Sequence, residues 1–417
     1  MKHLNSRAPV GASGFAMLLC VLAACGDDAT ALPFDADGSA PPVEDAGTGE
    51  VAPSTDAATP PDASDGASPR APFDPTPAEI TCGDGACAKR IVAGYGHYCV
   101  VLADQSLRCW GKARALAPSV DASEPSTGPR TVAAVQAVID VAAGGDGTCA
   151  VTTDGSVLCW DTTRSTPTPV AGIAGADRVW VASNGTMRCA RVAGDLMCWR
   201  GGAVSKLETG VPGVVEAVAL SSNATFVIAD GGEVSSAGTD GLLLGRPASS
   251  VAGSPSPVED LPLVLSMGVS SHACAIAVDG RLFCWGRGTG GQLGLGYSRD
   301  EIRPAEVRFP TRAWPQQIAV ASYHSCVRTT DGALWCWAGT NDRGQLGYPE
   351  STGVYVPTRV TTLGTTATAA VATADKSTCA IATDGTVRCW GDNRNGELGQ
   401  KALDQLRHPM PAIVDLE

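Results

Sequence analysis

Short apolar runs recur along the chain in pairs, and an Asp-Gly turn separates the two members of most pairs. In the clearest copy, apolar runs that contain Cys379 and Cys389 flank Asp384-Gly385, and Trp390 follows the second cysteine. Two such runs joined by Asp-Gly are typical of a β-hairpin. The pattern therefore predicts an all-β protein built from one repeated hairpin.

Six copies of the hairpin carry one cysteine in each run, with a tryptophan directly after the second. A regular repeat of this length indicates one closed array rather than several domains. The pairs are Cys99/Cys109, Cys149/Cys159, Cys189/Cys198, Cys274/Cys284, Cys326/Cys336 and Cys379/Cys389, followed by Trp110, Trp160, Trp199, Trp285, Trp337 and Trp390.

A seventh copy has lost both cysteines. Phe226 takes the place of the first, and Ser235 or Ser236 takes the place of the second, on either side of Asp230-Gly231. Their joint loss indicates that the two cysteines of each hairpin are partners, because bonds between neighbouring hairpins would leave single cysteines on either side.

Hairpin geometry supports the same pairing. A three-residue Thr-Asp-Gly loop places Cys149 opposite Cys159, and the two-residue Ala193-Gly194 loop compensates for the shorter spacing of the third pair. Opposed residues have Cα atoms about 4.5–5.5 Å apart, within reach of a disulfide.

The remaining cysteines fit an exported protein. Cys82 and Cys87 make a seventh pair, and Cys20 and Cys25 lie in an N-terminal targeting stretch. An even count behind an export signal predicts disulfides formed in an oxidising compartment. Each short bridge is expected to add about 2–3 kcal/mol to stability.

The N-terminus has the features of a signal peptide. Lys2 and Arg7 precede an apolar run that ends Leu22-Ala-Ala-Cys25, and this run is too short to span a bilayer comfortably. Its end resembles the lipobox of bacterial lipoproteins, which implies removal of residues 1–24 and lipidation of Cys25. An ordinary secretory signal, with Cys25 unmodified, is the alternative.

Residues 25–80 are expected to form a disordered tether rich in Ala, Asp, Pro, Ser and Gly. Residues 26–80 hold 12 acidic side chains and one arginine, so they carry most of the net charge of −13. Such a segment buries too little apolar surface to fold. The rest of the chain is nearly neutral, which excludes the basic surface of a nucleic-acid binder.

From residue 81 to residue 417 each repeat predicts three to four short strands. The later copies add a turn such as Gly344-Gln-Leu-Gly347 and a segment that runs from a proline to a valine. The string from His324 to Trp337 followed by Gly344–Gly347 resembles the repeat of the regulator of chromosome condensation family. This resemblance covers about residues 90–415 and implies a seven-bladed β-propeller.

The closure of the ring is expected to involve the C-terminus. Proline-to-valine type segments occur at both ends of the array, near Pro75–Ile80 and at Pro411–Val414, although there are only seven hairpins. We expect the C-terminal strand to complete the first blade, with the Cys82/Cys87 loop beside it.

No residue pattern predicts catalysis, a cofactor or a metal site. His97, His272 and His324 each precede the first hairpin cysteine by two residues, and a position that follows the repeat is expected to be structural. The tryptophan series is expected to pack between blades. The stretch Asp392–Glu397 resembles a calcium loop only faintly, since its third position is Arg394.

The family resemblance implies a non-enzymatic binding scaffold with a protein partner. A monomer anchored in the bacterial cell envelope is expected, in the outer membrane or at the cell surface rather than in the inner membrane. Nucleotide exchange on a small GTPase, hydrolysis of glycans, and inhibition of an enzyme are the alternatives. Aromatic residues outside the repeat pattern are the candidates for the binding face: Tyr95, Tyr98, Trp180, Trp314, Tyr323 and Tyr355.

Overall fold

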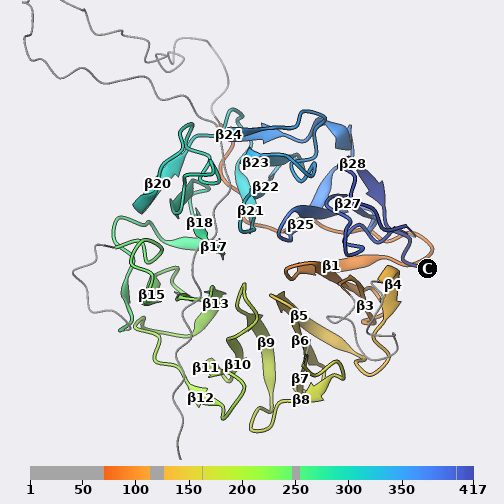
Figure 1. The fold of residues 1–417 in the computed structure, drawn as a ribbon. Coiled ribbons are helices and arrows are strands. Elements are labelled where there is room, and N and C mark those ends of the chain that lie inside the picture. Colours follow the sequence, from red (N-terminus) through yellow and green to blue (C-terminus); the bar gives the residue numbers. More distant parts are fainter. Residues whose placement is uncertain (1–69, 113–125, 162, 247–253, 401) are drawn as a thin grey trace, which may run out of the picture. The chain divides into compact units, whose positions relative to one another are not determined.

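Seven antiparallel sheets of four strands each make up the domain that spans residues 70–417 (Figure 1). In this computed structural model the described residues are 70–112, 126–161, 163–246, 254–400 and 402–417. Each blade uses four strands that are consecutive in the sequence, and the first strand of each blade lies nearest the centre. The predicted seven-bladed β-propeller is confirmed.

The first four blades contain strands β1 to β16. Their bounds are β1 Ala88–Ala93, β2 His97–Leu102, β3 Leu107–Gly111, β4 Ser126–Thr131, β5 Val138–Gly144, β6 Gly147–Thr152, β7 Val157–Trp160, β8 Thr168–Pro169, β9 Ala176–Val181, β10 Arg188–Val192, β11 Asp195–Trp199, β12 Ser205–Lys206, β13 Val215–Leu220, β14 Ala224–Ala229, β15 Val234–Gly238 and β16 Ser256–Pro257.

The last three blades contain strands β17 to β28 and one short 3₁₀ helix. Their bounds are β17 Val264–Val269, β18 His272–Ala277, β19 Leu282–Gly286, β20 Glu301–Val307, β21 Pro315–Val320, β22 Ser325–Thr329, β23 Leu334–Thr340, β24 Thr352–Arg359, η2 Thr361–Leu363, β25 Thr368–Thr373, β26 Ser377–Ala382, β27 Val387–Gly391 and β28 His408–Ile413.

The hairpin disulfides join the second and third strands of six blades, as predicted. Cys82 is bonded to Cys87, which completes the seven predicted pairs. The hairpin bonds are Cys99–Cys109, Cys149–Cys159, Cys189–Cys198, Cys274–Cys284, Cys326–Cys336 and Cys379–Cys389.

The bonded cysteines lie directly opposite each other across each hairpin. For Cys149 and Cys159 the Cα atoms are 4.1 Å apart, slightly closer than the expected range. In blade 3, Ala193 and Gly194 both adopt positive φ, so the two-residue turn restores the opposition of the cysteines.

Blade 4 uses packing and hydrogen bonds where the others have a disulfide. Phe226 lies opposite Ser236, which settles the two alternatives for the second position. The Phe226 ring is completely buried and meets the edge of Trp285 in the next blade. The Ser236 hydroxyl donates to the carbonyl of Leu244 and accepts a hydrogen bond from Arg246.

Adjacent blades are joined by a repeated set of buried contacts. The indole N–H of Trp337 in blade 6 donates to the Gln292 carbonyl of blade 5, and Trp390 makes the same bond to Gln345. Trp110 and Trp285 bond in the same way to Glu397 and Leu243. The turns after the third strands therefore bind these four tryptophans of the following blades, in agreement with the predicted packing of the series between blades.

The histidines that precede the hairpins also join blades. The Nε2 atoms of His97, His272 and His324 lie 2.8, 2.6 and 2.9 Å from a hydroxyl of the next blade, and all three rings are completely buried. Their predicted structural role is confirmed. Burial lowers the pKa of His97 to about 4 and the pKa of the other two to about 3, so they are neutral in the folded protein.

The expected closure was wrong. The C-terminal strand β28 pairs with β27 and completes blade 7, while blade 1 is completed by its own β4. Pro129–Val132 supplies the proline-to-valine segment of blade 1, so no exchanged strand is required. Blades 1 and 7 meet through a shared apolar cluster that includes Trp110, Leu398 and Val414.

A segment without regular structure, residues 70–81, crosses one face of blades 5 to 7. We call it the strap; the sequence analysis placed residues 70–80 in the tether. Phe73 packs on the cluster between blades 5 and 6, and Ile80 packs on the cluster between blades 7 and 1. The Thr81 N–H then donates to the Thr383 carbonyl in the hairpin turn of blade 7. The predicted lipidation of Cys25 lies outside the described residues.

Candidate binding face

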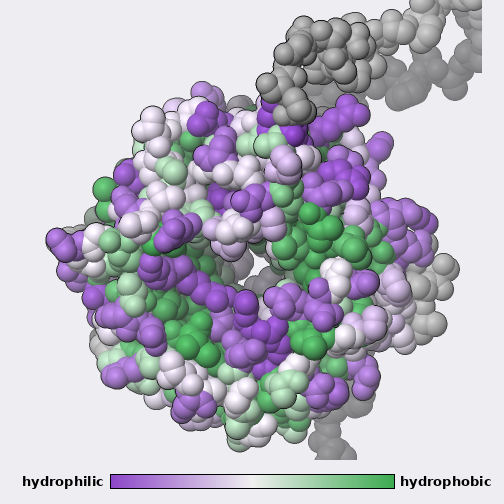
Figure 2. Space-filling view, turned by 180° about the vertical axis from the view of Figure 1, so that it is seen from behind, coloured by the Kyte–Doolittle hydropathy of each residue, from purple (hydrophilic) through white to green (hydrophobic). Residues whose placement is uncertain are grey.

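The two faces of the ring carry different loops. The mouth face carries the loops between the first and second strands and between the third and fourth strands of each blade. The turn face carries the Asp-Gly turns between the second and third strands, because consecutive strands are antiparallel. Figure 2 shows one face of the ring, on which hydrophilic and hydrophobic residues are interspersed around a central opening.

The hairpin cysteines belong to the scaffold and not to either face. The second cysteine of a pair lies on the third strand of its blade and is buried there, as four examples show: Cys109, Cys198, Cys284 and Cys336. A binding site must therefore be sought in the loops.

The central cavity opens at the mouth face. It has a volume of about 220 Å³ and is lined by the first strands, with Gly94, Gly144 and Gly268 among the lining residues. A second cavity of about 540 Å³ shares Tyr95, Ser183 and other residues with the first. Its remaining lining is mainly polar, so the mouth face offers a hydrophilic depression with an aromatic edge.

Tyr95 and Tyr323 are the candidate aromatics that this face exposes most. Each follows the first strand of its blade, and each side chain is 52 % exposed. The Tyr95 carbonyl accepts a hydrogen bond from the Asp375 N–H at 3.3 Å, and the ammonium of the adjacent Lys376 lies over the Tyr323 ring. The structure therefore places two of the predicted binding residues around the same loop of blade 7. The charge of Asp375 raises the pKa of Tyr95.

Each of the two tyrosines has a lysine over its ring. The Lys112 ammonium lies 5.9 Å from the ring centroid of Tyr95 and 2.8 Å from a carboxylate oxygen of Asp146. The Lys376 ammonium lies 5.7 Å from the ring centroid of Tyr323 and 2.7 Å from Asp342. Exposed contacts of these kinds contribute about 1 kcal/mol or less each, so they orient the tyrosines without removing them from solvent.

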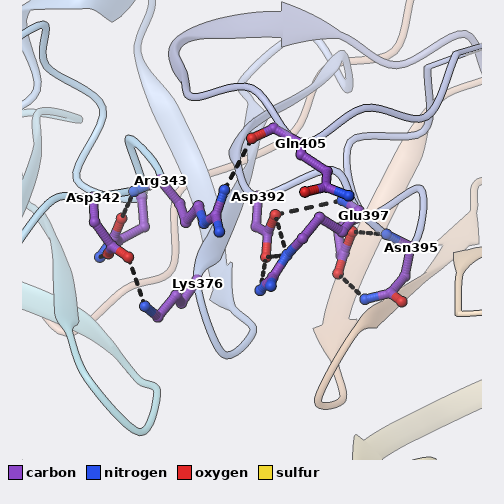
Figure 3. A network of polar contacts seen from close by, with 9 residues as sticks. Asp342, Arg343, Lys376, Asp392, Asn395, Glu397 and Gln405 are labelled. Carbon is purple, nitrogen blue, oxygen red and sulfur yellow. Dashed lines mark hydrogen bonds and ion pairs between the residues drawn. The ribbon is translucent and has the colours of Figure 1, made fainter.

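The mouth face continues onto the long loops of blades 6 and 7, where Figure 3 shows a polar network. Lys376 pairs with Asp342, and Arg343 donates to the carbonyl of Gln405. In the stretch that faintly resembles a calcium loop, Arg394 forms an ion pair with Asp392. An internal cation thus occupies one side of the Asp392 carboxylate.

Glu397 departs from the turn chemistry of the preceding blade. At the equivalent position, Gln345 accepts a hydrogen bond from the Arg343 N–H and donates one to the Thr340 carbonyl. The Glu397 carboxylate accepts bonds from the backbone and side chain of Asn395, but an ionised carboxylate has no proton to donate. Burial raises its pKa, and the charge of Asp392 adds to the effect.

We expect Glu397→Gln to stabilise the protein by about 1 kcal/mol at pH 7, since it removes a desolvated charge and restores a donor. A carboxyl group whose folded pKa is raised is destabilising above its unfolded pKa, near 4.5. The gain should therefore shrink as the pH falls toward that value. Urea unfolding at pH 7 and near pH 4.5 measures this gain in stability. Gln345→Glu is the reciprocal variant and is expected to lose stability at pH 7.

The other four candidate aromatics lie elsewhere. Tyr98 is completely buried, and its hydroxyl bonds to Ser377 across the junction of blades 7 and 1, so it cannot contribute to an exposed face. Trp180 packs on the cluster between blades 3 and 4. Trp314 lies on the turn face beneath the strap, and Tyr355 lies on the outer strand β24, where it is 42 % exposed.

The sequence analysis missed the two lysines and their carboxylate partners. Lys112 directly follows the Cys-Trp-Gly of its repeat, and Lys376 precedes Cys379 by three residues, so both occupy variable positions next to constant ones. That variability was the available signal. The pairing of Lys112 with Asp146 of the next blade depends on the ring and is not visible in the sequence.

The described residues do not bring together three or more His, Cys, Asp or Glu side chains that could hold a metal ion. In the same part of the chain, no helix has the length and apolar character needed to cross a membrane. What the mouth face presents is a set of exposed aromatic, cationic and anionic groups suited to binding.

The class of protein follows from this geometry: a disulfide-bonded, seven-bladed β-propeller. The regulator of chromosome condensation (RCC1) repeat matches residues 279–328 and 331–381, and a second pattern of the same repeat matches 88–113, 138–160, 265–292, 316–345 and 369–397. The matched segments, which together make up less than half of the chain, are thus similar to the RCC1 repeat, as their sequence suggested.

Curated relatives match over about a third of the chain. The ultraviolet-B receptor UVR8 of Arabidopsis thaliana is 30% identical over 145 residues, which are 34% of this chain and 33% of the receptor. The human E3 ubiquitin-protein ligase HERC2 is 33% identical over 142 residues, which are 34% of this chain and 3% of the ligase. The matched part therefore spans a minor share of each relative.

Solved structures share the fold. Yeast RCC1 (Prp20) bound to Kap60 superposes with a TM-score of 0.64 at 17% identity, covering 79% of this chain and 85% of that one. Human WBSCR16 gives a TM-score of 0.63 at 17% identity, covering 75% of this chain and 94% of that one. At these identities the likeness establishes the propeller alone.

Proposed function

We propose that this protein is an exported, non-enzymatic scaffold that binds a protein partner through its mouth face and is held in the bacterial cell envelope by a lipid on Cys25. The seven disulfides favour an oxidising compartment. The family resemblance supports a protein partner, since yeast Prp20p, which has the same fold, binds Gsp1p and histones.

The exposure of Tyr95 and Tyr323 near each other carries the proposal. Large aromatic side chains that remain half-exposed and are surrounded by polar groups are typical of binding hot spots. The constant tryptophans and histidines of the repeats, by contrast, are used in contacts between blades. The mouth face is therefore where this scaffold has groups left for a partner.

We expect the Tyr95→Ala/Tyr323→Ala variant to lose the partner, with affinity reduced roughly 30-fold or more, since truncation of a hot-spot residue costs about 2 kcal/mol. Immobilised wild-type and variant domains would be compared by quantitative mass spectrometry of the proteins they retain from envelope extracts. Tyr355→Ala is the matched control, an exposed tyrosine away from the mouth. Equal retention by all three would contradict the proposal.

Lipid anchoring is expected to depend on Cys25. The Cys25→Ser variant should move from the membrane fraction to the soluble fraction, because a diacylglyceryl thioether requires the thiol. The intact mass of the N-terminal peptide of the wild-type protein should include the acyl groups. An unmodified Cys25 at a free N-terminus would instead support ordinary secretion.

A further inference from the structure

The strap makes side-chain-specific contacts with the turn face at blades 5 and 6. The Arg70 guanidinium lies over the Trp314 ring at 3.1 Å from its centroid, and its Nε and Nη2 atoms donate to the carbonyls of Arg312 and Ala313 at 2.8 and 2.7 Å. One arginine thus satisfies two carbonyls and covers an indole face. A lysine could not reproduce this planar arrangement.

The indole of Trp314 holds the strap from the other direction. Its Nε1 atom donates to the Ala71 carbonyl at 2.7 Å, and the Phe73 ring meets its edge with centroids 6.3 Å apart. Phe73 also lies over Gly280, where an added Cβ would come within 2.9 Å of the phenylalanine ring. The absence of a side chain at Gly280 is what makes room for this aromatic residue.

The strap backbone is recognised as well. The side-chain amide of Gln316 donates to the carbonyls of Asp74 and Thr76. The Asp74 carboxylate accepts the Thr76 N–H at 2.9 Å, and hydrogen bonds from Thr76 both fix the local turn and lower the pKa of Asp74. Pro72 and Pro75 restrict the unbound segment, so little conformational entropy is lost on docking.

These contacts have the form of peptide recognition rather than of core packing. The strap pairs with no strand; its residues 70–72 and 74–77 are exposed, while Phe73 between them is half-buried. The strap contributes one arginine side chain, one phenylalanine side chain and three backbone carbonyls to these contacts. The propeller contributes Trp314, Gln316 and the loop before β21.

We propose that the turn face of blades 5 and 6 is a peptide-recognition surface whose resident ligand is the chain's own segment Arg70–Thr76. This surface selects a proline-containing peptide with arginine at its first position and phenylalanine at its fourth. This inference does not depend on the mouth-face function, because it concerns the opposite face of the ring.

The test uses the full chain and a fluorescein-labelled synthetic peptide that spans residues 68–80. In the Arg70→Ala/Phe73→Ala chain the resident segment is released, and fluorescence anisotropy should show saturable binding of the peptide. In the wild-type chain the tethered segment competes with the peptide at an effective concentration near millimolar. The apparent affinity of the peptide for the wild-type chain should therefore be at least tenfold weaker than for the released chain. A peptide with alanine at both recognition positions should bind at least tenfold more weakly to the released chain.

Two further variants separate recognition from general disruption. Adding Trp314→Ala or Gln316→Ala to the released chain should abolish or weaken peptide binding by at least tenfold, and circular dichroism would establish that each variant is folded. Tyr355→Ala in the same background should leave binding unchanged. Failure of the peptide to bind the released chain, equal binding to the wild-type chain, or equal binding to the Trp314 variant would each overturn the proposal.

Discussion

Trp337→Ala should lower the free energy of unfolding by about 3–5 kcal/mol, the usual cost of truncating a large buried side chain. The ring is completely buried, and its N–H is bonded to the Gln292 carbonyl of the preceding blade at 2.8 Å. The substitution opens a cavity at a blade interface and removes one of the two hydrogen bonds that this carbonyl accepts, the other coming from the Ser325 hydroxyl. Urea unfolding followed by circular dichroism measures the loss.

The matched control is Trp335→Ala, two residues earlier on the same strand, where the indole is half-buried. Its loss should be clearly smaller. Trp337→Phe separates the two contributions, since it keeps most of the apolar volume and removes the indole donor; we expect about 1–3 kcal/mol. Equal losses of stability for the Trp335 and Trp337 substitutions would contradict the prediction that the tryptophans between blades stabilise the protein more than other tryptophans.

The second large effect is a loss of stability in mild acid. His97, His272 and His324 have folded pKa values of about 4, 3 and 3, whereas an unfolded histidine titrates near 6.5. Below pH 6.5 the unfolded chain therefore binds protons that the folded chain does not. Above pH 6.5 the three histidines do not lower the free energy of unfolding. As the pH falls from there toward the folded pKa values, that free energy decreases by up to about 1.4 kcal/mol per histidine per pH unit.

The slope of unfolding free energy against pH between 6 and 5 measures this effect. His324→Gln should reduce the slope by about one third of the histidine contribution, whatever it does to stability at pH 7. His408→Gln is the control, since that side chain lies partly exposed beside Asp404 on the outer strand of blade 7. An unchanged slope in the His324 variant would show that the buried histidine is not responsible.

Features within one repeat could be predicted from the sequence because their physics is local. Turn geometry alone opposes Cys149 to Cys159, and the loss of both cysteines in blade 4 identifies Phe226 as a substitute. Ring closure was different, since Pro129–Val132 was overlooked as the outer segment of blade 1 and Pro75–Ile80 was assigned an equivalent role. Pro75–Ile80 and Pro411–Val414 then both remained as candidates for the outer strand of blade 1, and sequence spacing alone could not decide between them.

The candidate face could be predicted only in part for a related reason. Tyr95 and Tyr98 both stand outside the repeat pattern, yet one is half-exposed and the other completely buried. Tyr98 is buried because its hydroxyl reaches Ser377 and its ring stacks on Trp110 at the junction of the first and last blades. That junction joins residues nearly 300 positions apart, so no local pattern reveals it.

We expect the strap also to determine how the domain responds to mechanical load. A pull on the chain at Arg70 acts first on the contacts with Trp314 and Gln316, then on the bond between Thr81 and Thr383, and reaches β1 only after these have given way. The Cys82–Cys87 bridge limits how far the chain can extend between the last of these contacts and the first strand. Force is thereby expected to act on blades 6 and 7 before it reaches β1.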